Sequence, residues 1–147
     1  MLDVFEMLKS LTICLCLVVI IISCNSQPSP KDVTFEFIAA VLDGDTTTIL
    51  QYLDLERMAE RKMKDIVLKD SILNPADFKA EILSELTGLG QTRNQWKNQR
   101  ILVNKEIVRG DSAEVEMTFI DQFTGTIKYS MVYLHHKDNR WLVYFYK

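Results

Sequence analysis

The sequence predicts an α+β domain in which N-terminal helices pack on a curved four-stranded antiparallel sheet, after a short leader. An apolar run at Leu11–Ile22 stands apart from the rest of the chain. From residue 30 to about residue 86, apolar side chains recur at helical spacing. From Gln99 onward, β-branched and aromatic residues alternate between short turns. Helices followed by an antiparallel meander are typical of the α+β class, and residues 31–147 suffice for one such domain.

The apolar run is 12 residues long, whereas a membrane-spanning helix needs about 20 apolar residues. Its length is that of the hydrophobic region of an export signal. The residues that end it, Ile21-Ile22-Ser23-Cys24, resemble the lipobox of bacterial lipoproteins. This resemblance implies that residues 1–23 are a lipoprotein signal peptide and that Cys24 is acylated. The lipid would anchor the protein to a membrane of the bacterial cell envelope, with the domain outside the cytoplasm.

Residues 24–30 then form the lipidated cysteine and a polar, proline-containing tether. Two alternatives to lipidation are a plain secretory signal and a short uncleaved anchor. The start of translation is also open, because signal peptides usually begin with basic residues and Asp3 and Glu6 are acidic. Initiation at Met7 would remove both acids. The sequence leaves open whether the inner or the outer membrane holds the lipid.

Charge and cysteine content exclude several functions. Without residues 1–23 the chain keeps 16 basic and 18 acidic residues, so it lacks the basic surface that a nucleic-acid partner requires. Cys14 and Cys16 leave with the leader, and Cys24 precedes the domain. The domain therefore has no disulfide, no cysteine metal site and no thiol nucleophile. We expect no cofactor.

The first helix has clear signals at both ends. Ser29 is a candidate N-cap, Pro30 fits the first helical position, and Asp32 suits the positive first turn. Gly44 suits a left-handed stop. The apolar face comprises Val33, Phe37, Ala40 and Val41.

Later helices are predicted to begin at N-caps Asp45, Asp54 and Asn74, and Gly88 and Gly90 end the last of them. The third helix should direct its apolar residues to the core. These residues are Leu55, Met58, Ala59, Met63, Ile66 and Val67. Pro75 favours a break between the third and fourth helices.

The second half of the sequence predicts four strands that are joined by short turns. The strands are Arg100–Val108, Ala113–Ile120, Thr126–His135 and Arg140–Tyr146. Strict alternation would place Trp141, Val143 and Phe145 on one face of the last strand. The opposite face would carry Leu142, Tyr144 and Tyr146. Since both faces are apolar or amphipathic, the last two strands should be covered on both sides, lie centrally or contact a partner.

Three short segments resemble small nuclear transport factor 2-like (cystatin-like) domains. They are Leu42-Asp43-Gly44-Asp45, Gly110–Val115 and the hairpin Lys137–Val143 with its basic residue followed by Trp. The resemblance implies a cone-shaped domain whose bent sheet wraps helices and often leaves a pocket. Family enzymes of the polyketide-cyclase-like and ketosteroid-isomerase-like types place an acid, Tyr or His in that pocket. No such motif can be matched here residue by residue, so we assign no catalytic residue.

Five aromatic residues are candidates to line a pocket: Tyr52, Trp96, Tyr129, Tyr133 and Trp141. Tyr129 and Tyr133 share one face of a predicted strand, and we expect Trp141 near them across the hairpin. The simpler interpretation is that these rings only pack the core and its rim.

The polar candidate residues are expected to have structural roles rather than catalytic or metal-binding ones. His135 and His136 are adjacent in a strand and point to opposite faces, so they cannot bind one metal ion together, and we predict no metal site. Asp111 and Asp121 lie beside turns, where Asp commonly bonds to its own backbone. A role as general base is the lesser alternative.

The sequence therefore favours a non-enzymatic, lipid-anchored accessory domain that binds a small apolar ligand or a protein partner. One alternative is a cyclase- or isomerase-type enzyme that uses an acid or a Tyr in the pocket. Another is a structural envelope protein that forms a homodimer through Leu142, Tyr144 and Tyr146.

Overall fold

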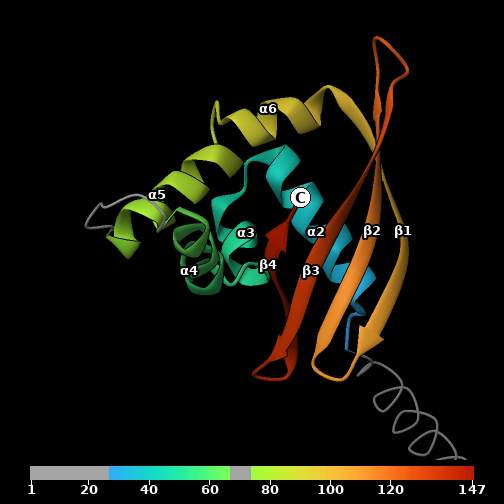
Figure 1. Ribbon diagram of the computed structural model, residues 1–147. Coiled ribbons are helices and arrows are strands. Elements are labelled where there is room, and N and C mark those ends of the chain that lie inside the picture. Colours follow the sequence, from blue (N-terminus) through green and yellow to red (C-terminus); the bar gives the residue numbers. More distant parts are fainter. Residues whose placement is uncertain (1–26, 67–73) are drawn as a thin grey trace, which may run out of the picture.

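The computed structural model describes residues 27–66 and 74–147, so the predicted signal peptide and Cys24 lie outside the described residues. Helices precede a four-stranded antiparallel sheet, which confirms the α+β prediction (Figure 1). No helix of the described residues has the length and apolar character needed to cross a bilayer. The elements are α2 (Pro30–Asp43), α3 (Thr46–Tyr52), α4 (Leu55–Ile66), α5 (Pro75–Leu86), α6 (Gln91–Lys97), β1 (Gln99–Arg109), β2 (Ser112–Asp121), β3 (Ile127–Lys137) and β4 (Arg140–Tyr146).

The predicted signals at the ends of α2 are confirmed. The Asp32 N–H donates to Ser29 Oγ at 3.2 Å, and the Ser29 N–H donates to Asp32 Oδ2 at 3.0 Å. This reciprocal capping box satisfies donors that the first turn leaves unpaired. Gly44 ends the helix at φ 74°, a conformation that favours glycine, and Asp45 caps α3 as predicted.

The predicted break between the third and fourth helices is also confirmed. Asn74 caps α5, with its Oδ1 accepting from the Ala76 N–H at 3.1 Å. In α4, Met58 and Ala59 are buried as expected, whereas Val67 lies outside the described residues.

Helix α6 was not predicted. Its only buried apolar residue is Trp96, so it shows no apolar periodicity. It follows α5 after a tight turn at Gly90, where an added Cβ would lie 2.2 Å from the Ser84 carbonyl oxygen. Only glycine allows this close approach.

The strands pair in the order β1-β2-β3-β4, and their bounds agree with the predicted ones to within two residues. One face of the sheet, here called the inner face, packs against α2, and the other is the outer face. A β-bulge between Tyr133 and Leu134 shifts the pairing of β3 with β4. Trp141 and Val143 consequently lie on the inner face, while Phe145 pairs with Tyr133 on the outer face. The prediction that Trp141, Val143 and Phe145 share a face is wrong, because a bulge reverses the alternation beyond it.

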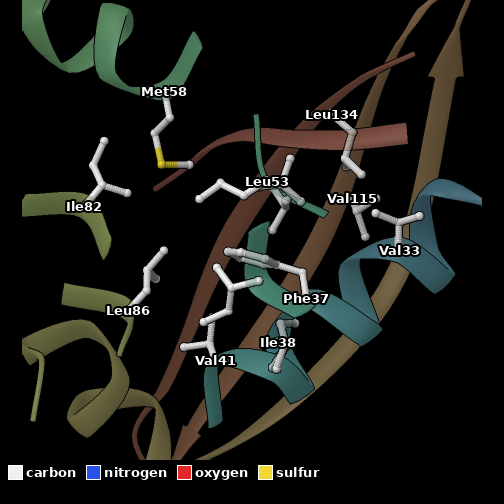
Figure 2. Close-up of a cluster of buried hydrophobic side chains, with 14 of the residues drawn as sticks. Val33, Phe37, Ile38, Val41, Leu53, Met58, Ile82, Leu86, Val115 and Leu134 are labelled. Atoms are coloured by element: carbon white, nitrogen blue, oxygen red, sulfur yellow. The ribbon is translucent and has the colours of Figure 1, made fainter. Parts of the chain in front are cut away.

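The core forms between α2 and the inner face. Phe37 and Val41 of α2 are completely buried, and so are Val115 of β2 and Leu134 of β3. Figure 2 shows these side chains converging, with residues of α4 and α5 closing the cluster at one side. The segment after α3 reaches the edge of β4, where Leu53 forms a parallel bridge to Val143. This contact places the start of α4 beside the last strand.

Candidate functional site

A pocket of about 340 Å³ opens between α6 and the inner face, close to the turn that joins β2 and β3. We call it the α6 pocket. Its lining comprises Thr92, Gln95, Trp96, Gln99, Phe119, Lys128, Tyr129, Ser130, Tyr146 and Lys147. Its volume lies at the lower end of the range typical of small-molecule sites.

The floor of the α6 pocket is aromatic. The Trp96 ring lies 5.6 Å from that of Tyr146 and 5.8 Å from that of Phe119, measured between centroids. On its other side it meets Phe37 of α2 edge-to-face at 6.2 Å. Trp96 is only 6% exposed, so the floor is continuous with the core and is held rigidly by it.

Tyr146 lines both the α6 pocket and a smaller cavity of about 200 Å³, which it shares with Met58, Ile82 and Phe145. Burial raises the pKa of Tyr146 to about 12, and the charge of Glu85 adds to the rise. A hydrogen bond with the Thr92 side chain opposes it only in part. The phenol therefore stays protonated at neutral pH and can act as a hydrogen-bond donor.

The rim of the α6 pocket is polar, with the amides of Gln95 and Gln99, the hydroxyls of Thr92 and Ser130, and the ammonium of Lys128. None of the described residues that line it is Asp, Glu, His or Cys.

The neighbouring Asp121 is a turn residue, as predicted. Its Oδ1 accepts from the backbone N–H groups of Phe123 and Thr124 at 3.0 and 2.7 Å. The N–H and hydroxyl of Thr124, followed by the N–H of Phe123, lower the pKa of Asp121, and the charge of Lys128 adds to this. Asp121 and Lys128 both line a neighbouring cavity of about 150 Å³.

The five predicted pocket residues do not converge on one site. Trp96 forms the floor of the α6 pocket, and Tyr129 contributes to its edge although 75% of its surface is exposed. Tyr129 and Tyr133 share the outer face, as expected. Tyr52 packs against the core from α3, and Trp141 packs against it from β4.

The expected proximity of Trp141 to Tyr133 is wrong. A two-residue turn, Asp138 and Asn139, joins β3 to β4, and both residues have positive φ (49° and 63°). This geometry pairs Trp141 with His136, with ring centroids 5.0 Å apart, on the face opposite Tyr133. An Asp-Asn pair between two strands signals such a turn, so the register was readable from the sequence.

A second polar cluster lies on the outer face beside β4, and sequence reasoning did not predict it. The ring of His135 lies between Asp54 and Arg57, with Nε2 2.9 Å from Asp54 Oδ2 and Nδ1 2.6 Å from Arg57 Nη1. A guanidinium can only donate, so Nδ1 accepts and Nε2 carries the proton given to Asp54. Lys137 Nζ approaches Asp54 at 3.5 Å, and the Arg57 guanidinium covers the Tyr144 ring at 4.2 Å.

The two titratable groups of this cluster shift together. Burial and the charge of Arg57 lower the pKa of His135 against the opposing effect of Asp54. Burial raises the pKa of Asp54, but the Arg57 N–H, Lys137 and His135 outweigh it and the net shift is downward. Both ring nitrogens of His135 are engaged, which leaves neither to face a substrate. Within the described ranges no three His, Cys, Asp or Glu side chains form a metal-binding group.

The residues expected to form a dimer face do not lie together on the surface. Leu142 is 5% exposed, Tyr144 lies beneath Arg57, and Tyr146 points into the α6 pocket. The apolar residues that the outer face exposes include Ile127 and Tyr129, with Leu102 beside them, and Ile107 farther along β1.

Comparison with solved structures gives a similarity of fold. No family profile matches the sequence, and no curated protein is detectably similar to it. Among solved structures, the chain is similar to a Campylobacter jejuni protein provisionally named an NTF2-like transpeptidase. The match has a TM-score of 0.49 and 19% identity, and it covers 79% of this chain and 97% of the other. It concerns the arrangement of helices and strands, not an activity.

Proposed function

We propose that the chain is a lipid-anchored protein of the bacterial cell envelope whose single domain binds a small ring compound in the α6 pocket without transforming it. The lipobox-like segment that ends in Cys24 and the polar tether after it support the lipid anchor. The observation that carries the binding function is the aromatic floor of the pocket beneath a rim of amides and hydroxyls.

The composition of the pocket defines the ligand class. Aromatic rings contact the apolar face of a ring compound, and the Gln95 and Gln99 amides can bond to its hydroxyl or carbonyl groups. Lys128 and Lys147 also line the pocket, with the Lys147 ammonium 5.6 Å from the centre of the Tyr133 ring. We propose a neutral ligand, because the aromatic floor and the two amides require no charge on it. The enzymatic alternative retains one candidate group, the protonated phenol of Tyr146.

A bulky substitution at the mouth of the pocket tests whether ligands bind there. Gln95 is exposed on α6, so Gln95→Trp should fold normally and occlude the site. Gln51→Trp makes the same change at an exposed helical position away from the pocket. Thermal-shift screening of neutral sugars, nucleosides and heterocycles should find compounds that stabilise the wild type and Gln51→Trp but not Gln95→Trp. Stabilisation of all three proteins, or of none, would refute binding in the α6 pocket.

The anchor is tested separately by intact-mass analysis of the native protein. We expect an N-terminus at Cys24 that carries a diacylglyceryl group and acyl chains. An unmodified Cys24, or retention of residues 1–23, would contradict the anchor.

A homodimer formed through the sheet is a second candidate function. Ile127 and Tyr129 favour it, because they are 55% and 75% exposed on the outer face. Exposed apolar side chains that lie together often mark an interface. Sedimentation velocity over a range of concentrations decides the question, and a monomer at all concentrations would exclude the dimer.

A further inference from the structure

The two ends of the domain differ in their distance from the predicted tether. The start of α2 follows the tether directly, and the Lys31 N–H donates to Glu106 Oε2 at 2.6 Å, near the end of β1. The His136 N–H donates to the Asp111 carbonyl at 2.9 Å, which joins the turn of the first hairpin to the end of β3. The start of α2 and the turns at residues 110–111 and 138–139 therefore share one end of the domain, here called the tether end (Figure 1).

The α6 pocket lies at the opposite end. Helix α2 runs along the sheet and ends against α6, where Arg93 Nε donates to the Val41 carbonyl at 3.0 Å (Figure 1). With 14 residues, α2 spans about 21 Å. Along the sheet, β3 has 11 residues and spans about 33 Å from the turn beside the pocket to the tether end.

The tether is too short to bridge that distance. Cys24 and Ser29 are five residues apart, so even a fully extended chain separates their Cα atoms by about 18 Å at most. Ser29 is fixed to the body by its capping box with Asp32. A lipid on Cys24 would therefore hold the tether end near the headgroups, and the pocket mouth lies farther from Ser29 than the tether is long.

From these lengths we infer that the tether end of the domain faces the phospholipid headgroups and that the α6 pocket opens away from the membrane. The inference rests on the proposed acylation of Cys24. It also deepens the proposed function, because a pocket in this orientation receives a water-soluble ligand from the aqueous compartment and not a lipid drawn from its own bilayer. The two turns of the tether end carry both signs of charge, on Arg109, Asp111, Lys137, Asp138 and Arg140. Neither sign dominates there, so the surface can approach an anionic headgroup layer.

Labels at the two ends test the orientation. Cys14 and Cys16 leave with the signal peptide and the Cys24 thiol is blocked by lipid, so an introduced cysteine is a unique labelling site. Asp111→Cys places a bimane label at the tether end, and Phe123→Cys places one at the turn beside the pocket; both positions are exposed.

The full lipidated proteins are inserted into phosphatidylethanolamine–phosphatidylglycerol vesicles that contain a lipid with a nitroxide on its headgroup. The Asp111→Cys label should lose most of its fluorescence and the Phe123→Cys label should keep it. Equal quenching of vesicle-bound proteins, or the reverse order, would overturn the inference.

A longer tether is the matched control. Insertion of about 20 Gly/Ser residues after Ser26 gives a reach longer than the domain, so the contrast between the labels should vanish. A contrast that survives would show that tether length does not orient the domain and would overturn the inference. Intact mass of the same samples separates the two proposals. An unmodified Cys24 with neither label quenched refutes the anchor, whereas an acylated Cys24 with equal quenching refutes only the orientation.

Discussion

The α6 pocket and the cluster of Asp54, His135 and Arg57 differ in how much of their hydrogen-bonding capacity the protein itself uses. In the cluster, both nitrogens of His135 are engaged and Asp54 accepts from three directions. In the pocket, the Ser130 hydroxyl donates to the Lys147 carbonyl and Thr92 bonds with Tyr146, whereas the amides of Gln95 and Gln99 form no side-chain hydrogen bond within the described residues. Buried polar groups that satisfy one another stabilise a fold, whereas polar groups around a cavity remain available to a ligand. The comparison indicates that the titratable cluster is structural, and it supports the proposal that the α6 pocket binds a ligand.

The largest expected effect concerns the floor of the pocket. Trp96→Ala should reduce the free energy of unfolding by about 3–5 kcal/mol, because it leaves a cavity among packed rings. Chemical denaturation measures this loss. The control is Phe123→Ala at a residue that is 84% exposed, which should change stability by less than about 0.5 kcal/mol. If the two variants were equally stable, the floor would not belong to the core.

The next effect concerns Asp54, which caps α4 and bonds to His135. Its Oδ1 accepts from the Arg57 N–H at 3.0 Å and its Oδ2 from His135. Asp54→Ala should destabilise the protein by about 2–3 kcal/mol, because it removes an N-cap and leaves a half-buried donor unpaired. Asp45→Ala removes only the cap of α3 and should have a smaller effect in the same denaturation experiment. Equal losses would mean that the contact with His135 adds nothing.

The smallest effect concerns the dependence of stability on pH. The pKa of His135 in the folded protein lies below its ordinary value of 6.5. As the pH falls below about 6.5, the unfolded chain therefore binds this proton first, and stability declines toward the pKa of the folded state. The lowered pKa of Asp54 acts in the same direction, but below its ordinary value of 3.8. His135→Gln should lose less stability than the wild type between pH 7 and pH 5.

The neighbouring histidine supplies the control for this measurement. His136 contacts Trp141 on the inner face, so His136→Gln leaves the cluster intact and should keep the dependence of the wild type. Thermal melts across the pH range measure both variants. A His135→Gln variant with the same slope as the wild type would show that His135 is not the group that titrates.

Local chemistry determined most of what could be predicted of the fold. Ser29, Gly44, Asp45 and Asn74 act through neighbours within a few residues, so their roles as caps could be recognised from sequence alone. The four strands were recognisable from alternation. Helix α6 was missed because one buried residue, Trp96, produces no period.

The sites depend on contacts that no local pattern records. Asp54 was recognised as a cap, but its meeting with His135, 81 residues later, follows from the position of α4 beside β4. The bulge between Tyr133 and Leu134 was equally hidden, since an extra residue in a strand leaves no mark in its composition. Among the five aromatic candidates, Trp96 and Tyr129 line the α6 pocket, whereas Trp141 lies on the face opposite Tyr133 because the turn at Asp138 and Asn139 sets the register of the hairpin.

The bridge between Leu53 and Val143 has a consequence for the behaviour of many copies held close together. A terminal strand with free backbone groups can recruit a strand from another molecule and begin a fibril. Here the Asp54 N–H already donates to the Val143 carbonyl at 2.8 Å, and α4 follows at once. A second copy of the chain that approached the β4 edge would find the Val143 carbonyl already hydrogen-bonded. Sheets of crowded molecules would then not join into a growing ribbon through the β4 edge.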